Sequence, residues 1–444
     1  MDDLLMLRRL PGSYKGPWSG EQEHGTGVAK FGGEPMSGSQ DFFRTRQPQA
    51  AFKHGILSRY PVVFASKTGQ SRKVVFLDGY AGRGEYKDGS PGSPLLLSRT
   101  AKRVGDFRYV TGIYVERNKA DFQNLQQVMA EHGRPEDVVL GGDLHELLPQ
   151  VLQTAQATAL FAFLDPFGTA LDREQLVDQL LNRQSGRAPT EVLLHISIST
   201  VARIGGLLRR RREVGALSPA DRKTIAHADR FLGGTWWQQH FDPVKDQKDE
   251  RGATAAALEV AAKYQKGVEV GARCMSLSMP IRHKPGQLPK YLLVLFTRHV
   301  DGLWNFADAV GKAGREWEGA WRSAEMAKAR TKAAGVNEYA LFGVDTLLPP
   351  AEEPFDIKEY EKAHHAEWVR IIEQNIVRLL ERHSGFVPVR RLAEVYDGVF
   401  GAAAIPQVRA AMKSLYQQGV ITNNGVGDFQ NQWVTLTGPT SRSA

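Results

Sequence analysis

The chain has 444 residues, more than one hydrophobic core usually accommodates, so we expect two or three domains. Its hydrophobic content of 42% and charged content of 24% are those of a soluble globular protein, and no apolar window is long enough for a membrane span. The net charge of +8 favours contact with nucleic acid, and the single cysteine, Cys274, excludes an intrachain disulfide and a cysteine-built zinc site.

The beginning of the chain predicts an irregular arm followed by a helix. Residues 1–50 are rich in glycine, serine, glutamine and proline and have weak periodicity. Asp2 and Asp3 argue against a secretory signal, so we expect a cytoplasmic protein without membrane contact. Apolar residues at helical spacing then predict one amphipathic helix within 47–66.

From Val74 onward, predicted strands and helices alternate. Short apolar runs, typical of parallel strands buried on both faces, cover 74–77, 109–115, 138–140, 160–164 and 191–197. Helical patterns follow over 119–132, after His145 and over 174–181. Such units in series predict a doubly wound α/β sheet whose strand ends lie along one edge.

Residues 200–250 interrupt this alternation with a basic insertion. A helix over 254–265, two strands over 272–279 and 291–297, and a long polar helix over 302–333 follow. The two strands would complete a seven-stranded sheet as an antiparallel hairpin. We therefore predict a Rossmann-like, class I methyltransferase-type domain over 51–345.

The end of the chain predicts a separate winged-helix domain. Residues 346–365 contain prolines and acids and are interpreted as a linker. In 366–444, helices are predicted over 366–383, 389–396 and 406–418, followed by strands over 420–422 and 432–435. Three helices and a hairpin are the winged-helix arrangement, which binds DNA or RNA in some proteins and other proteins elsewhere.

A glycine-rich turn follows the first predicted strand, and acids end the next two. Glycines permit a tight turn and a close approach of ligand to backbone. An acid after the second strand can accept hydrogen bonds from a ribose, and one after the third can reach an adenine amino group. The pattern predicts an adenosyl-cofactor site, although acids after strands also form turns and cap helices. Its residues are Asp78, Gly79, Ala81, Gly82, Gly84, Glu116 and Asp143.

The position of the next helix favours S-adenosylmethionine over a dinucleotide. A dinucleotide turn runs straight into a helix whose N-terminus faces the pyrophosphate. Here eight residues, Glu85–Gly92, intervene, and the helix is predicted to begin at Ser93-Pro94 with Ser93 as its N-cap.

The fourth strand ends in the sharpest motif, Asp165-Pro166-Phe167-Gly168. It resembles the Asp-Pro-Pro-Tyr loop of amino-methyltransferases and the Asp-Pro-Phe-Gly of tRNA guanine dimethyltransferases. The resemblance implies that Asp165 accepts a hydrogen bond from a base amino group while Phe167 stacks on the base. The alternative is a tight turn with a phenylalanine in the core.

Four segments together resemble the three-Cys-motif partner protein family: 52–60, 76–86, 92–95 and 164–168. The resemblance covers about residues 50 to 335. It implies a separate partner protein with three cysteines, similar to radical iron–sulfur enzymes. The inserted loop Glu85–Gly92 departs from ordinary methyltransferases.

Several basic residues are candidates for nucleic-acid contact, with solvated helix faces as the alternative. His195, Trp236 and Trp237 are interpreted instead as core residues. The candidates are Lys53, Arg203, Arg209, Arg210, Arg211, Arg212, Arg409 and Lys413.

Three functions remain open. The first is methyl transfer from S-adenosylmethionine to a nucleic-acid base, with Asp165 and Phe167 holding the target. The second is a non-catalytic subunit that holds DNA or RNA for a three-cysteine partner enzyme. The third, a metal-dependent nuclease using Asp78, Asp143 and Asp165, is disfavoured because the strand order spreads these acids along an edge, so we predict no metal.

Overall fold

The computed structural model describes residues 48–68, 73–86, 88–166, 168–184, 188–241, 250–337 and 355–437. Almost all of the predicted N-terminal arm, the first part of the predicted linker, and Phe167 lie outside the described residues. The backbone of 209–214 is described, but the side chains there, including Arg209–Arg212, are not.

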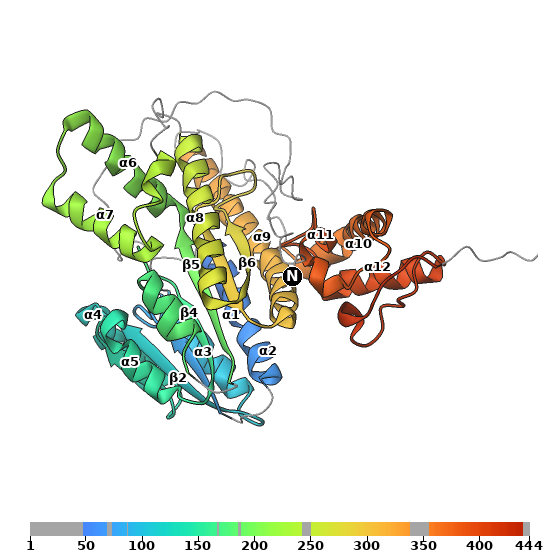
Figure 1. Cartoon of the computed structure of the whole chain (residues 1–444), viewed down its shortest axis with the longest axis horizontal. Helices are drawn as coiled ribbons and strands as arrows, with labels where there is room; N and C mark the ends of the chain where they lie inside the picture. Colours follow the sequence, from blue (N-terminus) through green and yellow to red (C-terminus); the bar gives the residue numbers. More distant parts are fainter. Residues whose placement is uncertain are drawn as a thin grey trace, which may run out of the picture.

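A seven-stranded sheet is the centre of the larger part of the molecule (Figure 1). Its order is β3-β2-β1-β4-β5-β7-β6; β1 to β5 run parallel, and β7 is antiparallel to both β5 and β6. This confirms the predicted doubly wound sheet and its final hairpin, in the strand arrangement of the class I methyltransferase fold. The strands are β1 Lys73–Asp78, β2 Tyr109–Glu116, β3 Val138–Gly141, β4 Ala159–Leu164, β5 Thr190–Ser197, β6 Met275–Ile281 and β7 Tyr291–Thr297.

The continuous apolar runs become strands because helices cover both faces of the sheet. In β1, Val74 and Phe76 point into one core, and Val75 and Leu77 point into the other. The first core is covered by α1 Pro48–Leu57, α2 Tyr60–Lys67, α3 Ser93–Arg103, α4 Lys119–His132 and α9 Val300–Asn337. The second is covered by α5 Leu144–Thr154, η2 Gln175–Leu181, α6 Ile198–Val214, α7 Pro219–Leu232, η3 Gln238–Phe241 and α8 Glu250–Ala272.

The helix predicted within 47–66 is two helices, α1 and α2. Pro61 lies in the first turn of α2, and it has no amide hydrogen to donate to the carbonyl of Leu57. The helix therefore ends at Leu57, and the Arg59 amide donates instead to the Ile56 carbonyl, 3.0 Å away. The predicted helix over 174–181 is also different in kind, because η2 is a π-helix.

The C-terminal unit consists of α10 Ile357–Arg382, η5 Pro388–Arg391, α11 Leu392–Val395 and α12 Ile405–Gln417, then η6 Phe429–Asn431. Because α10 begins at Ile357, the prediction of a linker as far as residue 365 is wrong. In place of the two predicted strands of the hairpin there are two isolated bridges, one between Ile421 and Leu436, just beyond the second predicted strand, and one between Val434 and Phe386. The short helix predicted over 389–396 is divided between η5 and α11.

The C-terminal unit packs against α9, as Figure 1 shows at the right of the molecule. Trp304 of α9 contacts the rings of Tyr396 and Phe429, with centroids 5.7 and 6.0 Å apart. Within α9, Gly314 lies so close to the Gly401 carbonyl that a Cβ there would overlap its oxygen. One continuous hydrophobic core therefore joins the C-terminal unit to the first face of the sheet.

Candidate functional site

A cavity of about 550 Å³ opens at the carboxyl ends of β1, β4 and β5, where an α/β sheet places its ligands. Its walls come from α1, the glycine-rich turn over 80–84, the residues after β4, the end of β5, and the loop that leads into β7. The volume is in the range of sites for small molecules and cofactors.

The glycine-rich turn is held by hydrogen bonds to the neighbouring strands. The Gly79 amide donates to the Phe163 carbonyl of β4 (3.0 Å), and the Ala81 amide donates to the Val115 carbonyl of β2 (2.9 Å). Gly82 and Gly84 have φ values of 62° and 89°, which disfavour residues with a side chain. The turn that the sequence predicts to bind a cofactor therefore forms one wall of this cavity.

The inserted loop folds back onto the turn. The Gly92 amide donates to the Gly84 carbonyl (2.8 Å), and the Tyr86 amide donates to the Ser90 carbonyl (2.9 Å). Helix α3 therefore begins at Ser93, as predicted, but its N-cap is Gly92 and not Ser93. The Ser93 side chain does not cap the helix; Ser93 lines the cavity.

Asp78 lies beneath the turn and is not among the residues that line the cavity. Its Oδ1 accepts the Tyr80 amide at 3.2 Å. Burial raises the pKa of Asp78 to about 7, against the opposing effect of the hydrogen bonds from Ser93 and from the Tyr80 amide. The Asp78 carboxyl therefore supports the glycine-rich turn by accepting the Tyr80 amide.

Glu116 is the last residue of β2 and Asp143 lies two residues after β3, and neither lines the cavity. Oε2 of Glu116 accepts the Gly82 amide at 2.8 Å, so this carboxylate lies directly against the turn, and burial raises its pKa. Asp143 is the N-cap of α5, with Oδ1 3.0 Å from the His145 amide, and its Oδ2 is 3.2 Å from Arg117. For Asp143 the helix-capping alternative is the one observed.

Four residues on the opposite wall form what we call the cavity cluster: Lys53, Asp165, His195 and Tyr291. Lys53 Nζ lies 2.5 Å from Asp165 Oδ2, and His195 Nδ1 lies 3.1 Å from Asp165 Oδ1. The Tyr291 ring is 4.4 Å from that of His195 and lies 5.6 Å from Lys53 Nζ. Helix α1, β4, β5 and β7 thus each contribute one member.

The charges of the cavity cluster are set by burial and by one another. Burial opposes ionisation of Asp165, but Lys53 and His195 outweigh it and hold the pKa of this carboxyl below its ordinary value. Burial, together with Lys53, lowers the pKa of His195 to about 4 although Asp165 opposes the shift. At neutral pH the cluster therefore contains an ionised Asp165 beside a neutral imidazole.

Sequence reasoning missed the role of His195 because a buried histidine at a strand end is usually a core residue. It is buried as expected, yet it lines the cavity, and neither its Nδ1 nor its Nε2 makes a hydrogen bond among the described residues. The Tyr291 hydroxyl likewise has none in the described part of the chain. The signal in the sequence was the position of His195 near the end of the fifth apolar run. The parallel register of β4 and β5 brings this position to the same edge of the sheet as Asp165.

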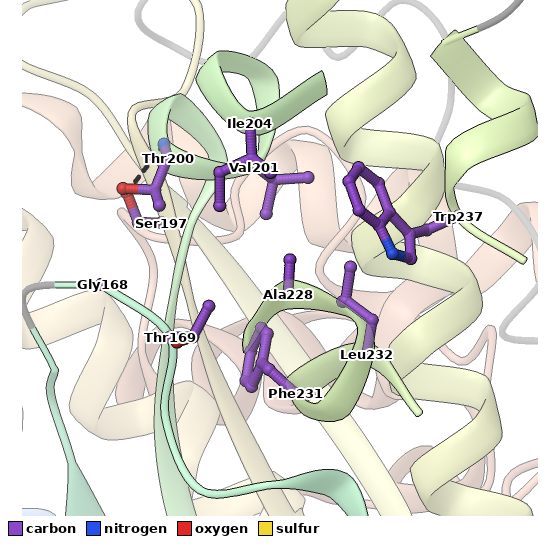
Figure 2. A pocket seen from close by; sticks show the side chains of 10 residues that line it. All are labelled: Gly168, Thr169, Ser197, Thr200, Val201, Ile204, Ala228, Phe231, Leu232 and Trp237. Carbon is purple, nitrogen blue, oxygen red and sulfur yellow. Dashed lines mark hydrogen bonds between the residues drawn. The ribbon is translucent and has the colours of Figure 1, made fainter. Parts of the chain in front are cut away.

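A second, much smaller recess adjoins the cavity (Figure 2). Its free volume is about 10 Å³, room for roughly one water molecule, so it is not a site for a larger ligand. Ser197 and Thr200 line both spaces, and the remaining lining of the recess is mostly apolar. Trp237 in its wall is fully buried, which confirms its prediction as a core residue.

The basic residues predicted to contact nucleic acid do not form one surface. Lys53 is buried in the cavity cluster, Arg203 is exposed on α6, and Figure 1 shows α6 and α12 on opposite sides of the molecule. On α12, Lys413 is exposed, whereas Arg409 donates to the Gly425 carbonyl (2.6 Å) and lies 4.7 Å over the Phe429 ring. Arg409 therefore has a structural role in holding the loop after α12.

The described residues contain no cluster of three or more His, Cys, Asp or Glu side chains that could hold a metal ion. Among their helices, none is both long enough and apolar enough to cross a membrane.

No family model matches the chain, and no curated protein matches it. Similar solved structures include the O-methyltransferase TomG from Streptomyces achromogenes in complex with SAM, with 10% identity, a TM-score of 0.29, and coverage of 56% of this chain and 80% of that chain. The SAH-bound methyltransferase PaMTH1 from Podospora anserina has 10% identity, a TM-score of 0.28, and coverage of 58% and 86%. The fold assignment stands on the strand order and directions described above.

Proposed function

We propose that the protein is an S-adenosylmethionine-dependent methyltransferase. The observation that carries this proposal is the single cavity that joins the glycine-rich turn, with Glu116 against it, to the cavity cluster. One wall suits an adenosyl cofactor, and the other holds a carboxylate and a neutral imidazole beside which an acceptor can bind.

The first turn of α3 favours this cofactor over a dinucleotide. A pyrophosphate needs several free amides at a helix N-terminus. Here the Gly92 amide is bound to the Gly84 carbonyl, and Pro94 has no amide hydrogen. Glu116, by contrast, retains lone pairs on both carboxylate oxygens and can accept hydrogen bonds from ribose hydroxyls.

The cavity cluster supplies a route for the proton. When bound, S-adenosylmethionine supplies the methyl group; the acceptor atom gains it and loses a proton. Neutral His195 can receive that proton at Nε2, and the charge of ionised Asp165, with Oδ1 3.1 Å from Nδ1, stabilises the imidazolium that forms. Lys53 keeps Asp165 ionised, so we assign Asp165 to stabilising the charge on His195 as well as to the predicted contact with a base.

The finer parts of the sequence interpretation stay predictions. We interpret α10, α11, α12 and the bridge between Ile421 and Leu436 as a winged helix, which would bind DNA or RNA through Lys413 and its neighbours. The resemblance to three-Cys-motif partner proteins, and with it a three-cysteine partner enzyme, also stays a prediction. The non-catalytic binding subunit remains the second candidate, because the Lys53–Asp165 pair occupies one oxygen of the predicted base-holding carboxylate.

Calorimetric titration with S-adenosylmethionine and its demethylated product tests the proposal. We expect Glu116→Ala to weaken binding by about 1 to 3 kcal/mol, since it leaves a pair of ribose hydroxyls without an acceptor. The matched control is Glu131→Ala on the exposed side of α4, which should bind like the wild type. A wild-type protein that binds neither compound would overturn the proposal.

A further inference from the structure

The loop between β6 and β7 is a concentration of positive charge at the mouth of the cavity. Residues 282–290 contain Arg282, His283, Lys284 and Lys290 and no acid. His283 and Lys290 line the cavity. Burial, then Lys290 and Lys328, lower the pKa of His283, so the charge of this loop belongs to Arg282, Lys284 and Lys290. The acid that faces the loop from α9 is Glu325, which pairs with Lys328 at 2.8 Å and whose pKa is lowered by that pair and by Lys284.

Helix α6 extends the positive charge away from the same opening. Its first turn lines the cavity through Ser199 and Thr200, and the Ser199 amide donates to the Lys290 carbonyl at 3.2 Å. This hydrogen bond joins the start of α6 to the end of the β6–β7 loop. Arg203 is exposed one turn further along. The sequence then places Arg209–Arg212 further along the helix, about 14 to 18 Å from Thr200 at 1.5 Å per residue.

Cations on two segments beside one opening fit a polyanion better than a single anionic group, because successive phosphates can each meet one of them. The cavity reaches the buried His195 and the half-buried Asp165, so an acceptor must project into it as an isolated group. Tyr86, Tyr291 and His54 are aromatic residues of its wall, and a planar group can lie beside them. An unstacked base of a nucleic acid is a planar group that can project into the cavity, and its backbone is a polyanion.

We propose that Arg203, Arg282, Lys284 and Lys290, here called the cationic rim, bind the backbone phosphates of a single-stranded nucleic acid, one base of which enters the cavity. The single strand is favoured because extracting a base from a duplex costs a few kcal/mol. This inference rests on the proposed function for the chemistry at the base, but the binding surface is testable alone.

The test is fluorescence anisotropy of the full chain with a labelled 20-nucleotide single strand of mixed sequence, as RNA and as DNA, across a salt series. The rim variant is Arg203→Gln with Lys284→Gln, both exposed and one from each segment. We expect weaker binding and a slope of log affinity against log salt that is shallower by about 1.4, or about 0.7 for each lost phosphate contact.

The matched control removes one Arg and one Lys elsewhere: Arg99→Gln with Lys102→Gln, exposed on the far half of α3. It should keep the wild-type slope. Equal slopes for the wild type and the rim variant overturn the inference, as does tighter binding of the corresponding duplex or of poly-glutamate. Because titration with S-adenosylmethionine needs no oligonucleotide, loss of the rim with cofactor binding intact is distinguishable from failure of the proposed function.

Discussion

Strand β5 carries two buried polar side chains on the same face, Glu191 near its start and His195 near its end, and their surroundings differ. Oε2 of Glu191 accepts the Tyr60 hydroxyl at 2.7 Å, and Oε1 accepts the Thr297 hydroxyl at 2.6 Å. We call these three residues the Glu191 cluster. At His195 the carboxylate of Asp165 lies nearby, but Nε2 has no partner in the described part of the chain.

The difference separates a region built for stability from one built for binding. A buried polar atom without a partner costs about 1 to 3 kcal/mol, so a fold keeps such atoms mainly where a ligand can satisfy them. Burial raises the pKa of Glu191, which suits a carboxyl group surrounded by hydroxyls, whereas Lys53 keeps Asp165 ionised against the effect of burial. An ionised carboxylate is thus held at the carboxyl ends of the strands, whereas buried polar atoms without a partner occur there and also elsewhere in the described residues, as at Trp304, Trp368 and Tyr396.

The largest expected effect on the free energy of unfolding comes from Asp78, which is buried at the carboxyl end of β1. Because its folded pKa of about 7 lies above its unfolded value, the folded protein takes up a proton, and stability is lost as pH rises toward 7. We expect the wild type to lose about 3 kcal/mol of unfolding free energy between pH 5 and pH 8 relative to Asp78→Asn.

Urea unfolding of both proteins at the two pH values measures this difference. Asp106→Asn, at an exposed position after α3, is the matched control and should follow the wild type. If Asp78→Asn loses stability with pH as steeply as the wild type, ionisation of the buried Asp78 carboxyl does not destabilise the fold.

A smaller effect tests the close packing of α9 against the C-terminal unit. Alanine in place of glycine inside a helix normally stabilises by up to about 1 kcal/mol. Gly314→Ala should instead destabilise by about 1 to 3 kcal/mol, because its Cβ would overlap the Gly401 oxygen. Gly206→Ala in α6, where a Cβ meets nothing within 4 Å, should show the ordinary stabilisation. Thermal unfolding compares them, and equal shifts would contradict the observed packing.

The strands were predictable because each is a short apolar run whose end is marked by a polar or glycine residue. The run 74–77 lies within β1, and the prediction for 119–132 matches α4. The break between α1 and α2 was missed because the apolar spacing continues across it, while the missing amide hydrogen of Pro61 is a backbone effect that periodicity does not register.

Of the candidate site, only the wall formed by the glycine-rich turn could be predicted from the sequence. The turn over 78–84 is a local pattern, so its position beside a cavity followed from the sequence. The contact between Lys53 and Asp165 joins residues 112 positions apart and depends on how α1 packs over the sheet edge, which no local pattern records. The structural use of Arg409 was likewise hidden, since it depends on the loop after α12 returning to the helix.

The smallest expected change in stability gives the most direct test, because a tyrosine hydroxyl is removed both from the Glu191 cluster and from the cavity cluster. Tyr60→Phe removes a hydroxyl that donates to Glu191 and leaves a buried oxygen with an unmet hydrogen bond, so we expect a loss of about 1 to 2 kcal/mol. Tyr291→Phe removes a hydroxyl that has no partner among the described residues, so stability should change by less than about 0.5 kcal/mol. Urea unfolding gives both values on one scale.

Ligand binding should show the reverse order, with S-adenosylmethionine or single-stranded nucleic acid bound more weakly by Tyr291→Phe and normally by Tyr60→Phe. Equal losses of stability, with binding unchanged in both, would mean that the cavity cluster is an ordinary part of the core.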